Sequence, residues 1–457
     1  MVDVRNFILK NIILFIIFFT KIVIADLLSE LDREQKEIQV DFFKLKNELL
    51  EPGLLKTAIA EKKSLIVISQ IESYKKFFKK YDDFNLKKID FIQEFLLKNA
   101  HEVVQQELEF SGKLSKNSKK WFKTLIERHH QYQKEKNRFG TDLDFYRTKI
   151  NFLATYGNFV NSIRTAQGEH PWRKFGGGKI LPFIDSPRDF FKVSDKFFNL
   201  IWNSYFRART GIPDRAPIVD ALSEIQGRFS KMRNLKTHWE GIENLQDTSH
   251  DGQTLNLFLI NHANSYFDTT VQQTFPLKNI SAMGNVDIIF PKFLSKQMIR
   301  SDHMITIGHG DTLSKTINLI KKKQLNKFFL SIEGFTGTGL YEMRPVIPLF
   351  AESLYAMIER GMKVKLYPIA FPDNFKLMND WRAPIEGNVV SKGVLRPLID
   401  TETCLDLFEL TKSKESISQI IRWDWFLTLN NSDDLVLSMP YPSVILNLIE
   451  EMTWGNK

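Results

Sequence analysis

The sequence lacks the features that define several common classes of protein. Its 457 residues include one cysteine, Cys404, so no internal disulfide can form and the fold does not depend on an oxidising compartment. A mean hydropathy of -0.23 excludes a polytopic transporter, which is apolar over most of its length. Zinc-ligand spacing of cysteine and histidine, a Gly-Lys-Ser/Thr phosphate loop, a nucleophile elbow and a dinucleotide fingerprint are all missing. The chain is therefore a globular protein whose chemistry must come from other patterns.

The charge of the chain is only weakly one-sided. Lys and Arg number 63 against 54 Asp and Glu, which gives a net charge of +9 and a pI of about 9.2. This excess suits an anionic surface or substrate, but it does not choose between nucleic acid, membrane and small anions. Phenylalanine is unusually frequent, at 38 residues, and favours either a phenylalanine-packed core or a lining for acyl chains.

The first 25 residues indicate targeting to a membrane. Arg5 and Lys10 precede the apolar run 12–19, and Lys21 separates it from the run 22–25. A basic start, a short apolar centre and a Val-x-Ala ending are typical of a cleaved signal peptide. A retained segment of this kind is shorter than the roughly 20 apolar residues of a membrane span, and is expected to lie at the bilayer surface as an anchor. Both interpretations stay open, and a buried N-terminal helix is the third.

Residues 26–155 have the pattern of a helical domain. Apolar side chains recur at three- and four-residue spacing in segments such as 41–50 and 84–96, which is the periodicity of amphipathic helices. Pro52 is the only proline in the first 170 residues, so little interrupts these helices. We expect a helical bundle. Its lysine-rich stretch is expected at the surface, with a membrane-facing patch as the alternative: Lys116, Lys119 and Lys120.

The remaining chain divides into two parts. Residues 156–250 are rich in loops, aromatic side chains and turns, and we expect a linking region packed on the catalytic domain. Its glycine run 176–178 does not follow an apolar strand and is interpreted as a flexible linker. The residues that can carry chemistry concentrate in 251–457, which is predicted to be the catalytic domain.

Four short apolar runs in that domain predict buried parallel strands. The runs and their polar neighbours are 257–260 before Asn261-His262, 304–307 before Gly308-His309, 328–332 before Glu333-Gly334, and 364–371, which contains Pro368. The carboxyl ends of parallel strands are where α/β sheets place their active sites. The sequence therefore predicts an α/β domain whose site is built from these strand ends.

His262 and Asp268 form the candidate catalytic pair. A helix that begins soon after His262 brings Asp268 within one or two turns of it. A carboxylate that accepts from one imidazole nitrogen fixes the tautomer and stabilises the imidazolium. The other nitrogen is then available to remove a proton from an alcohol.

The order of these motifs resembles that of the glycerolipid acyltransferase family. Strand-His-x-Asp, strand-Gly, strand-Glu-Gly and strand-Pro-Ile follow one another between about residues 255 and 371, roughly a quarter of the chain. The turn after Glu333, the Arg344-Pro345 element and the amphipathic segment 349–361 are most similar to the glycerol-3-phosphate acyltransferase branch. The resemblance implies an α/β fold with a glycerolipid-acyltransferase-like sheet and flanking helices, preceded here by the helical N-terminal domain.

The resemblance also implies a mechanism. His262 would act as the general base and Asp268 as its orienting partner, while the acceptor hydroxyl of glycerol 3-phosphate or a related glycerolipid attacks an acyl thioester. Glu333 and Gly334 would bind the acceptor, and Pro368 would line the channel for the acyl donor. Neither a metal nor a cofactor is implied, because acyl-CoA or acyl-carrier protein enters as a co-substrate.

Two departures from the family pattern bear on these assignments. Five residues separate His262 from Asp268 where the family has four, and one extra residue rotates a helical carboxylate by about 100°. The arginines that bind phosphate in the family are replaced, and His309 occupies the position of one of them. The basic residues that remain candidates for the phosphate are Arg300, Lys315 and Arg344.

These assignments predict partners and a location. We expect an acyl thioester donor, a hydroxylated acceptor with or without a phosphate, a membrane lipid surface and no nucleic acid. The expected location is the cytoplasmic face of a membrane, with export directed by the N-terminal segment as the alternative. The alternative function is that of a catalytically degenerate, membrane-associated lipid-binding protein.

Overall fold

The computed structural model describes most of the helical regions and the centre of a β-sheet. The residues that it describes are 2–136, 152–168, 236–246, 248, 251–261, 274–277, 280–284, 304–306, 317–318, 321, 325–333, 343–372, 390–430 and 441–454. In the first helix, side chains are described from residue 25 onward.

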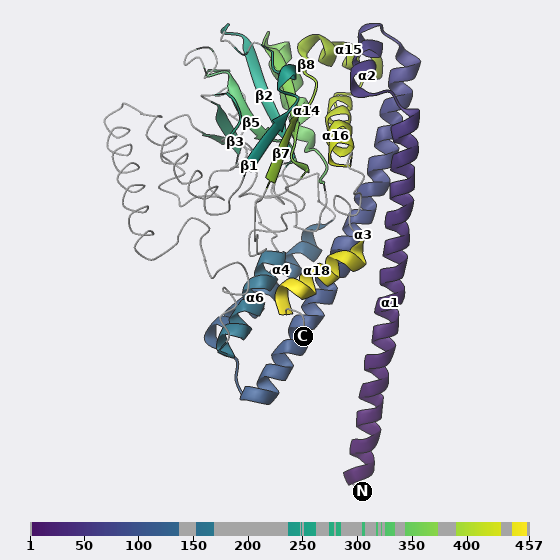
Figure 1. Ribbon diagram of the computed structural model, residues 1–457, viewed down its shortest axis with the longest axis vertical. Coiled ribbons are helices and arrows are strands. Elements are labelled where there is room, and N and C mark those ends of the chain that lie inside the picture. The colour runs from purple at the N-terminus through teal and green to yellow at the C-terminus, as the bar shows by residue number, and fades with distance from the viewer. Residues whose placement is uncertain are drawn as a thin grey trace, which may run out of the picture.

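A largely parallel sheet lies in the upper part of the molecule in Figure 1. Its strands are β1 (Lys236–Glu240), β2 (Thr254–Ile260), β3 (Ser281–Gly284), β4 (Met304–Thr306), β5 (Lys327–Ser331), β6 (Lys363–Ala370), β7 (Val390–Leu395) and β8 (Ile399–Asp400). Their spatial order is β1-β7-β6-β2-β5-β3-β4, and β8 pairs with β6. β2 to β6 run parallel to one another, whereas β7 and β8 are antiparallel to β6.

The four predicted strands are confirmed as β2, β4, β5 and β6. β2 lies between β5 and β6, and all seven of its residues are buried. Because side chains alternate across a strand, Leu257 and Leu259 pack on one face of the sheet, and Phe258 and Ile260 on the other. A central strand that is covered on both faces needs apolar residues at every position, which is why the sequence shows a continuous apolar run.

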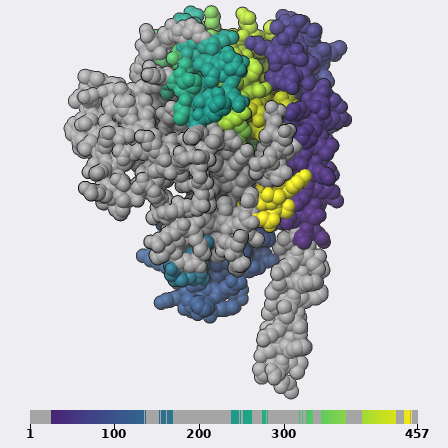
Figure 2. Space-filling model, in the orientation of Figure 1, coloured from purple at the N-terminus to yellow at the C-terminus, as the bar shows by residue number. Residues whose placement is uncertain are grey.

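Helices precede the sheet in the chain and also cover one of its faces. They are α1 (Val2–Glu48), α2 (Pro52–Ala60), α3 (Ser64–Ser111), α4 (Lys116–Glu135), α6 (Phe152–Ala166), α14 (Pro348–Glu359), α15 (Thr401–Thr411), α16 (Ser416–Leu429) and α18 (Pro442–Trp454), with a 3-10 turn at Ile242–Asn244. α1 and α3 lie side by side along one side of the molecule (Figure 1), and α1 is visible at the surface along that side (Figure 2). The expected α/β class with helices before the sheet is confirmed. The division into four sequence domains stays a prediction.

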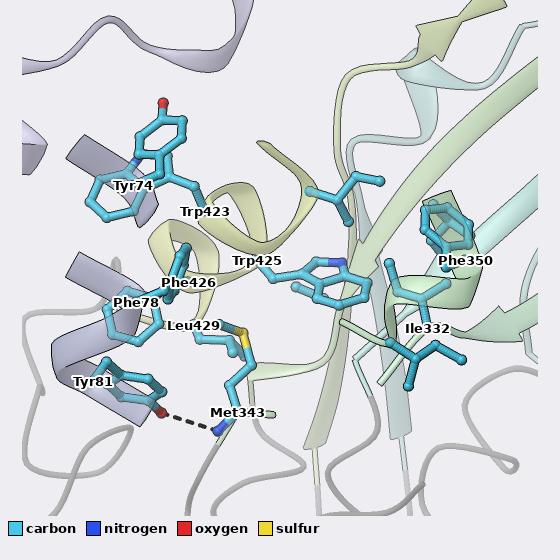
Figure 3. Close-up of a cluster of buried hydrophobic side chains, with 14 of the residues drawn as sticks. Tyr74, Phe78, Tyr81, Ile332, Met343, Phe350, Trp423, Trp425, Phe426 and Leu429 are labelled. Carbon is cyan, nitrogen blue, oxygen red and sulfur yellow. Dashed lines mark hydrogen bonds between the residues drawn. The ribbon is translucent and has the colours of Figure 1, made fainter. Parts of the chain in front are cut away.

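α16 is the helix that connects the N-terminal helices to the sheet. It packs against α3 on one side and against β6 on the other (Figures 1 and 3). Trp423 stacks on Tyr74 with 4.8 Å between the ring centroids, and Phe426 contacts Phe42 and Phe78. Trp423 and Phe426 belong to the aromatic and basic run 421–426, a composition that suits either a membrane interface or a core. In the structure this run is buried in the core.

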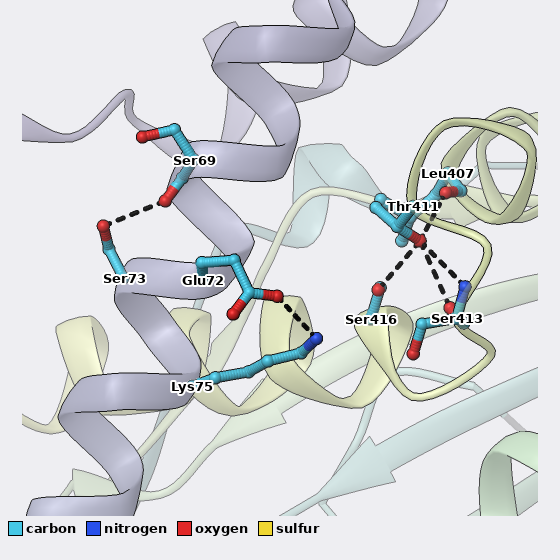
Figure 4. A network of polar contacts seen from close by, with 8 residues as sticks. All are labelled: Ser69, Glu72, Ser73, Lys75, Leu407, Thr411, Ser413 and Ser416. Carbon is cyan, nitrogen blue, oxygen red and sulfur yellow. Dashed lines mark hydrogen bonds and ion pairs between the residues drawn. The ribbon is translucent and has the colours of Figure 1, made fainter.

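Polar side chains fix the turn between α15 and α16. Thr411, at the end of α15, donates from its hydroxyl to the carbonyl of Leu407 (2.8 Å), and accepts from the amide of Ser413 and from the hydroxyl of Ser416 (Figure 4). Asp400 caps the start of α15 by accepting from the amide of Thr403 at 2.9 Å. These contacts set the direction in which α16 crosses the sheet.

Among the described residues, no helix combines the length and the apolarity needed to cross a membrane. α1 continues without a break through residue 25, where the cleavage site of a signal peptide was one interpretation. The signal and anchor assignments stay predictions.

Candidate active site at the carboxyl edge of the sheet

The carboxyl ends of β2, β5 and β6 meet at one edge of the sheet. In the register of these strands, Ile260 lies opposite both Ser331 and Ile369. Asn261 therefore leaves β2 next to the segment that carries Glu333 out of β5 and next to Phe371 after β6. Three of the four predicted strands therefore end at the same edge of the sheet.

Asn261 ties two of the strand ends together. Its side-chain oxygen accepts from the backbone amide of Phe371 at 2.8 Å. Its backbone amide donates to the carbonyl of Ile369 at 3.4 Å. The side chain is fully buried, so these contacts hold the exit of β2 rigidly against β6. The next residue is His262, which lies outside the described part of the chain, as do Asp268, Gly334 and His309.

Two of the predicted acceptor residues are brought together at this edge. The amide of Arg344 donates to Oε1 of Glu333 at 2.9 Å, and both residues are 2% exposed. Glu333 follows β5 directly, whereas Arg344 approaches from the extended segment before α14. The carboxylate of Glu333 thus fixes the backbone at Arg344. The order of residue types in the sequence does not reveal this contact.

A second set of contacts holds the residue before Arg344. The backbone amide of Met343 donates to the hydroxyl of Tyr81 at 3.1 Å (Figure 3). The carbonyl of Met343 accepts from Nη2 of Arg422 at 3.2 Å. Arg422 also forms a two-pronged ion pair with Asp82, with one of the two bonds at 2.8 Å. Burial raises the pKa of Tyr81 to about 12, so its hydroxyl stays neutral over the physiological range. α3 and α16 therefore hold the segment that carries Met343 and Arg344 in place.

Sequence reasoning missed Tyr81, Asp82 and Arg422. A partial signal exists, because Arg422 interrupts an otherwise aromatic helix and such a charge needs a partner when it is buried. The partner is 340 residues away, and only the fold identifies it.

We expect the replacement of Glu333 by leucine to lower the free energy of unfolding by about 1.5–3 kcal/mol, the range for a buried hydrogen bond to a charged group. Glu333→Gln keeps the Oε1 acceptor for the amide of Arg344 and is expected to lose less than half as much. Urea unfolding of the three proteins measures both values. A glutamine variant as unstable as the leucine variant would show that the bond to Arg344 is not what stabilises this turn.

The other predicted residue within the described chain is Pro368. It lies inside β6, opposite Leu259 of β2, and its carbonyl accepts from the amide of Arg396 at 2.8 Å. Its role in an acyl-donor channel stays a prediction.

Cys404 is fully buried in α15, and burial raises the pKa of its thiol to about 12, which agrees with a structural role and not a nucleophilic one.

Within the described ranges, no cluster of three or more His, Cys, Asp or Glu side chains is suited to hold a metal ion.

The fold and the edge geometry define an α/β protein with a candidate site at the carboxyl ends of β2, β5 and β6. No protein-family model matches the chain, and no curated protein matches it significantly. A solved structure that it matches is the 1-acyl-sn-glycerophosphate (LPA) acyltransferase PlsC from Thermotoga maritima. That match has 13% sequence identity and a TM-score of 0.32, and covers 49% of this chain and 97% of the other. A TM-score of this size does not establish a shared fold.

Proposed function

We propose that the protein is an O-acyltransferase that moves a fatty acyl group from acyl-CoA or acyl-carrier protein to a hydroxyl of glycerol 3-phosphate or a related glycerolipid acceptor. One observation carries the proposal. The strands that bear three of the four family-like motifs are adjacent and parallel, and their motif ends lie at one edge. Residues that are far apart in the sequence are thereby available to a single reaction centre.

The proposed reaction needs one base and no redox step. His262 removes the proton of the acceptor hydroxyl while the oxygen attacks the thioester carbonyl carbon, and Asp268 orients the imidazole. The tetrahedral intermediate then expels the thiolate, which takes the proton from His262. An ester and a free thiol are the products, and His262 returns to its neutral form.

The acceptor is assigned to the side of the edge formed by Glu333 and Arg344. The bond between the Glu333 carboxylate and the backbone of Arg344 supports this assignment, because it fixes the shape of that side before a substrate arrives. Arg344 is the basic residue that we assign to a phosphate of the acceptor. His309, Gly334 and Pro368 complete the proposed site as residues that contact acceptor or donor.

The proposal includes a location at the cytoplasmic face of a membrane, because acyl-CoA and acyl-carrier protein are cytoplasmic donors.

The test is release of free thiol by the purified full chain from palmitoyl-CoA and from palmitoyl-acyl-carrier protein. Glycerol 3-phosphate, dihydroxyacetone phosphate, lysophosphatidic acid and glycerol are offered one at a time. We expect release that depends on one of the phosphorylated acceptors, with the matching ester as product. Release that no acceptor stimulates would contradict acyl transfer. Lipid binding without turnover would identify the non-catalytic alternative.

A further inference from the structure

The turn between α3 and α4 forms an unusual surface, which we call the basic tip. Phe110 is 89% exposed there and Leu108 is 44% exposed. The tip also carries five exposed lysines: Lys113, Lys116, Lys119, Lys120 and Lys123. Phe110 thus presents an apolar ring to the solvent directly beside a cluster of positive charge.

The positive charge of the tip is mostly unbalanced. Residues 108–123 contain five lysines and one acidic residue, Glu109, for a net charge of +4. Lys123 is paired with Glu127 at 3.6 Å, and Lys120 lies 5.4 Å from the ring centre of Trp121. Over the described residues, none of the other four lysines is within ion-pair distance of a carboxylate. The field of the tip is therefore directed at the solvent.

These lysines do not stabilise the helix that carries them. Lys116, Lys119 and Lys120 lie in the first turns of α4, and the first turn contains no acidic residue. The amino end of a helix is the positive end of its dipole, where cations are unfavourable. Local helix stability therefore does not explain the cluster, whereas an external anion does.

The opposite end of α3 provides a contrast. Leu65 is 86% exposed at that end, but the lysines beside it are neutralised, Lys62 by Glu409 and Lys63 by Glu61. The basic tip instead lies toward the same end of the molecule as the N-terminus of α1 (Figure 1). That end of α1 contains the apolar run 12–19. Exposed positive charge, exposed aromatic surface and an apolar segment thus occur together at one end.

We propose that the basic tip docks on an anionic lipid bilayer. The lysines contact the phosphates of the headgroups, and Phe110 inserts between the headgroups and the acyl chains. The apolar run of α1 favours a bilayer over a nucleic acid as the occupant, because a nucleic acid offers no apolar phase. The inference does not depend on the proposed catalytic activity.

The first experiment measures co-sedimentation of the full chain with vesicles of phosphatidylcholine that contain either no or about 30% phosphatidylglycerol. The triple variant Lys116→Gln/Lys119→Gln/Lys120→Gln is expected to bind the anionic vesicles about a hundredfold more weakly, at about 1 kcal/mol per lysine near the surface. The control variant Lys36→Gln/Lys76→Gln/Lys79→Gln removes the same charge from exposed sites about 40 Å or more from the tip, judged from the helical rise. It is expected to bind like the wild type.

Two results would overturn the proposal. One is equal weakening by the two triple variants, which would show that only the net charge of the chain matters. The other is loss of binding to a single-stranded oligonucleotide, and not to the vesicles, in the first triple variant. Either outcome would reassign the tip.

The second experiment places a probe at the tip. Cys404 is buried and its pKa is raised, so a thiol-reactive fluorophore reacts selectively with an introduced surface cysteine. The emission of a polarity-sensitive dye on Phe110→Cys is expected to shift to the blue when anionic vesicles are added, and salt at about 1 M is expected to reverse the shift. The same dye on Leu65→Cys is expected to remain unchanged. A shift at Leu65→Cys without one at Phe110→Cys would refute docking through the basic tip.

Discussion

Replacement of His262 by alanine is expected to lower the turnover number of acyl transfer by about 10²- to 10⁴-fold, the contribution of a positioned general base. The Michaelis constant for the acyl donor is expected to change little, because the base acts on the acceptor hydroxyl in the chemical step. Asn261, its neighbour in the chain, is fixed against Phe371, so the backbone that leads into position 262 is anchored. A loss confined to turnover is the result that the mechanism requires.

The control for His262 is His238. This histidine lies on β1 with 67% of its side chain exposed, and is not part of the proposed site. His238→Ala is expected to retain full turnover in the same thiol-release assay. If His262→Ala kept more than about a tenth of the wild-type turnover, its role as general base would be wrong.

Replacement of Arg422 by methionine is expected to lower the free energy of unfolding by about 3 kcal/mol. Arg422 is 3% exposed and bonds both oxygens of Asp82 and the carbonyl of Met343. Methionine leaves the carboxylate of Asp82 without its cation in a mostly buried position. The lower end of the range for breaking a buried pair applies, because 25% of the Asp82 side chain stays exposed. Urea unfolding followed by circular dichroism measures the change.

Two variants separate the charge effect from general damage. Lys87→Met breaks an exposed pair with Glu34 between α3 and α1, and is expected to lower the free energy of unfolding by about 0.2–1 kcal/mol. The double variant Asp82→Leu/Arg422→Met removes both charges and is expected to recover most of the stability that Arg422→Met loses. If the double variant proved as unstable as the single one, the unpaired charge would not be the cause.

The sequence predicts β2, β4, β5 and β6, whereas β1 and β7 could not be predicted from it. β2 and β6 are covered on both faces, so most residues in them are apolar. Such a continuous apolar run can be recognised in the sequence without knowledge of the fold. β1 (Lys-Thr-His-Trp-Glu) and β7 (Val-Ser-Lys-Gly-Val-Leu) contain polar residues and a glycine. Gly393 leaves room for Trp239, whose ring would be 2.4 Å from an added Cβ atom. That pairing is a property of two segments together and has no local signal.

The position of a residue at the sheet edge could be predicted in the same way. Glu333 is expected there because a polar residue directly after a buried apolar run stands where the strand ends, whereas its role in a site stays a prediction. Its bond to the backbone of Arg344 depends on where the segment before α14 returns, and no residue type encodes an amide position. Tyr81, Asp82 and Arg422 act from helices at opposite ends of the sequence, so their convergence on Met343 required the fold.

The contacts between the first and last helices have a consequence for how the chain folds during synthesis. Three contacts join residues that are far apart in the sequence: Asp82 with Arg422, Gln39 with Tyr441 and Asp32 with Ser443, at separations of 340, 402 and 411 residues. The first residue of each pair is synthesised long before its partner. The apolar faces of α1 and α3 leave the ribosome long before α16 and α18 can cover them. Folding that depends on such distant contacts is slow and leaves apolar surface open to aggregation. We therefore expect the nascent chain to need protection by a chaperone until α16 and α18 have emerged.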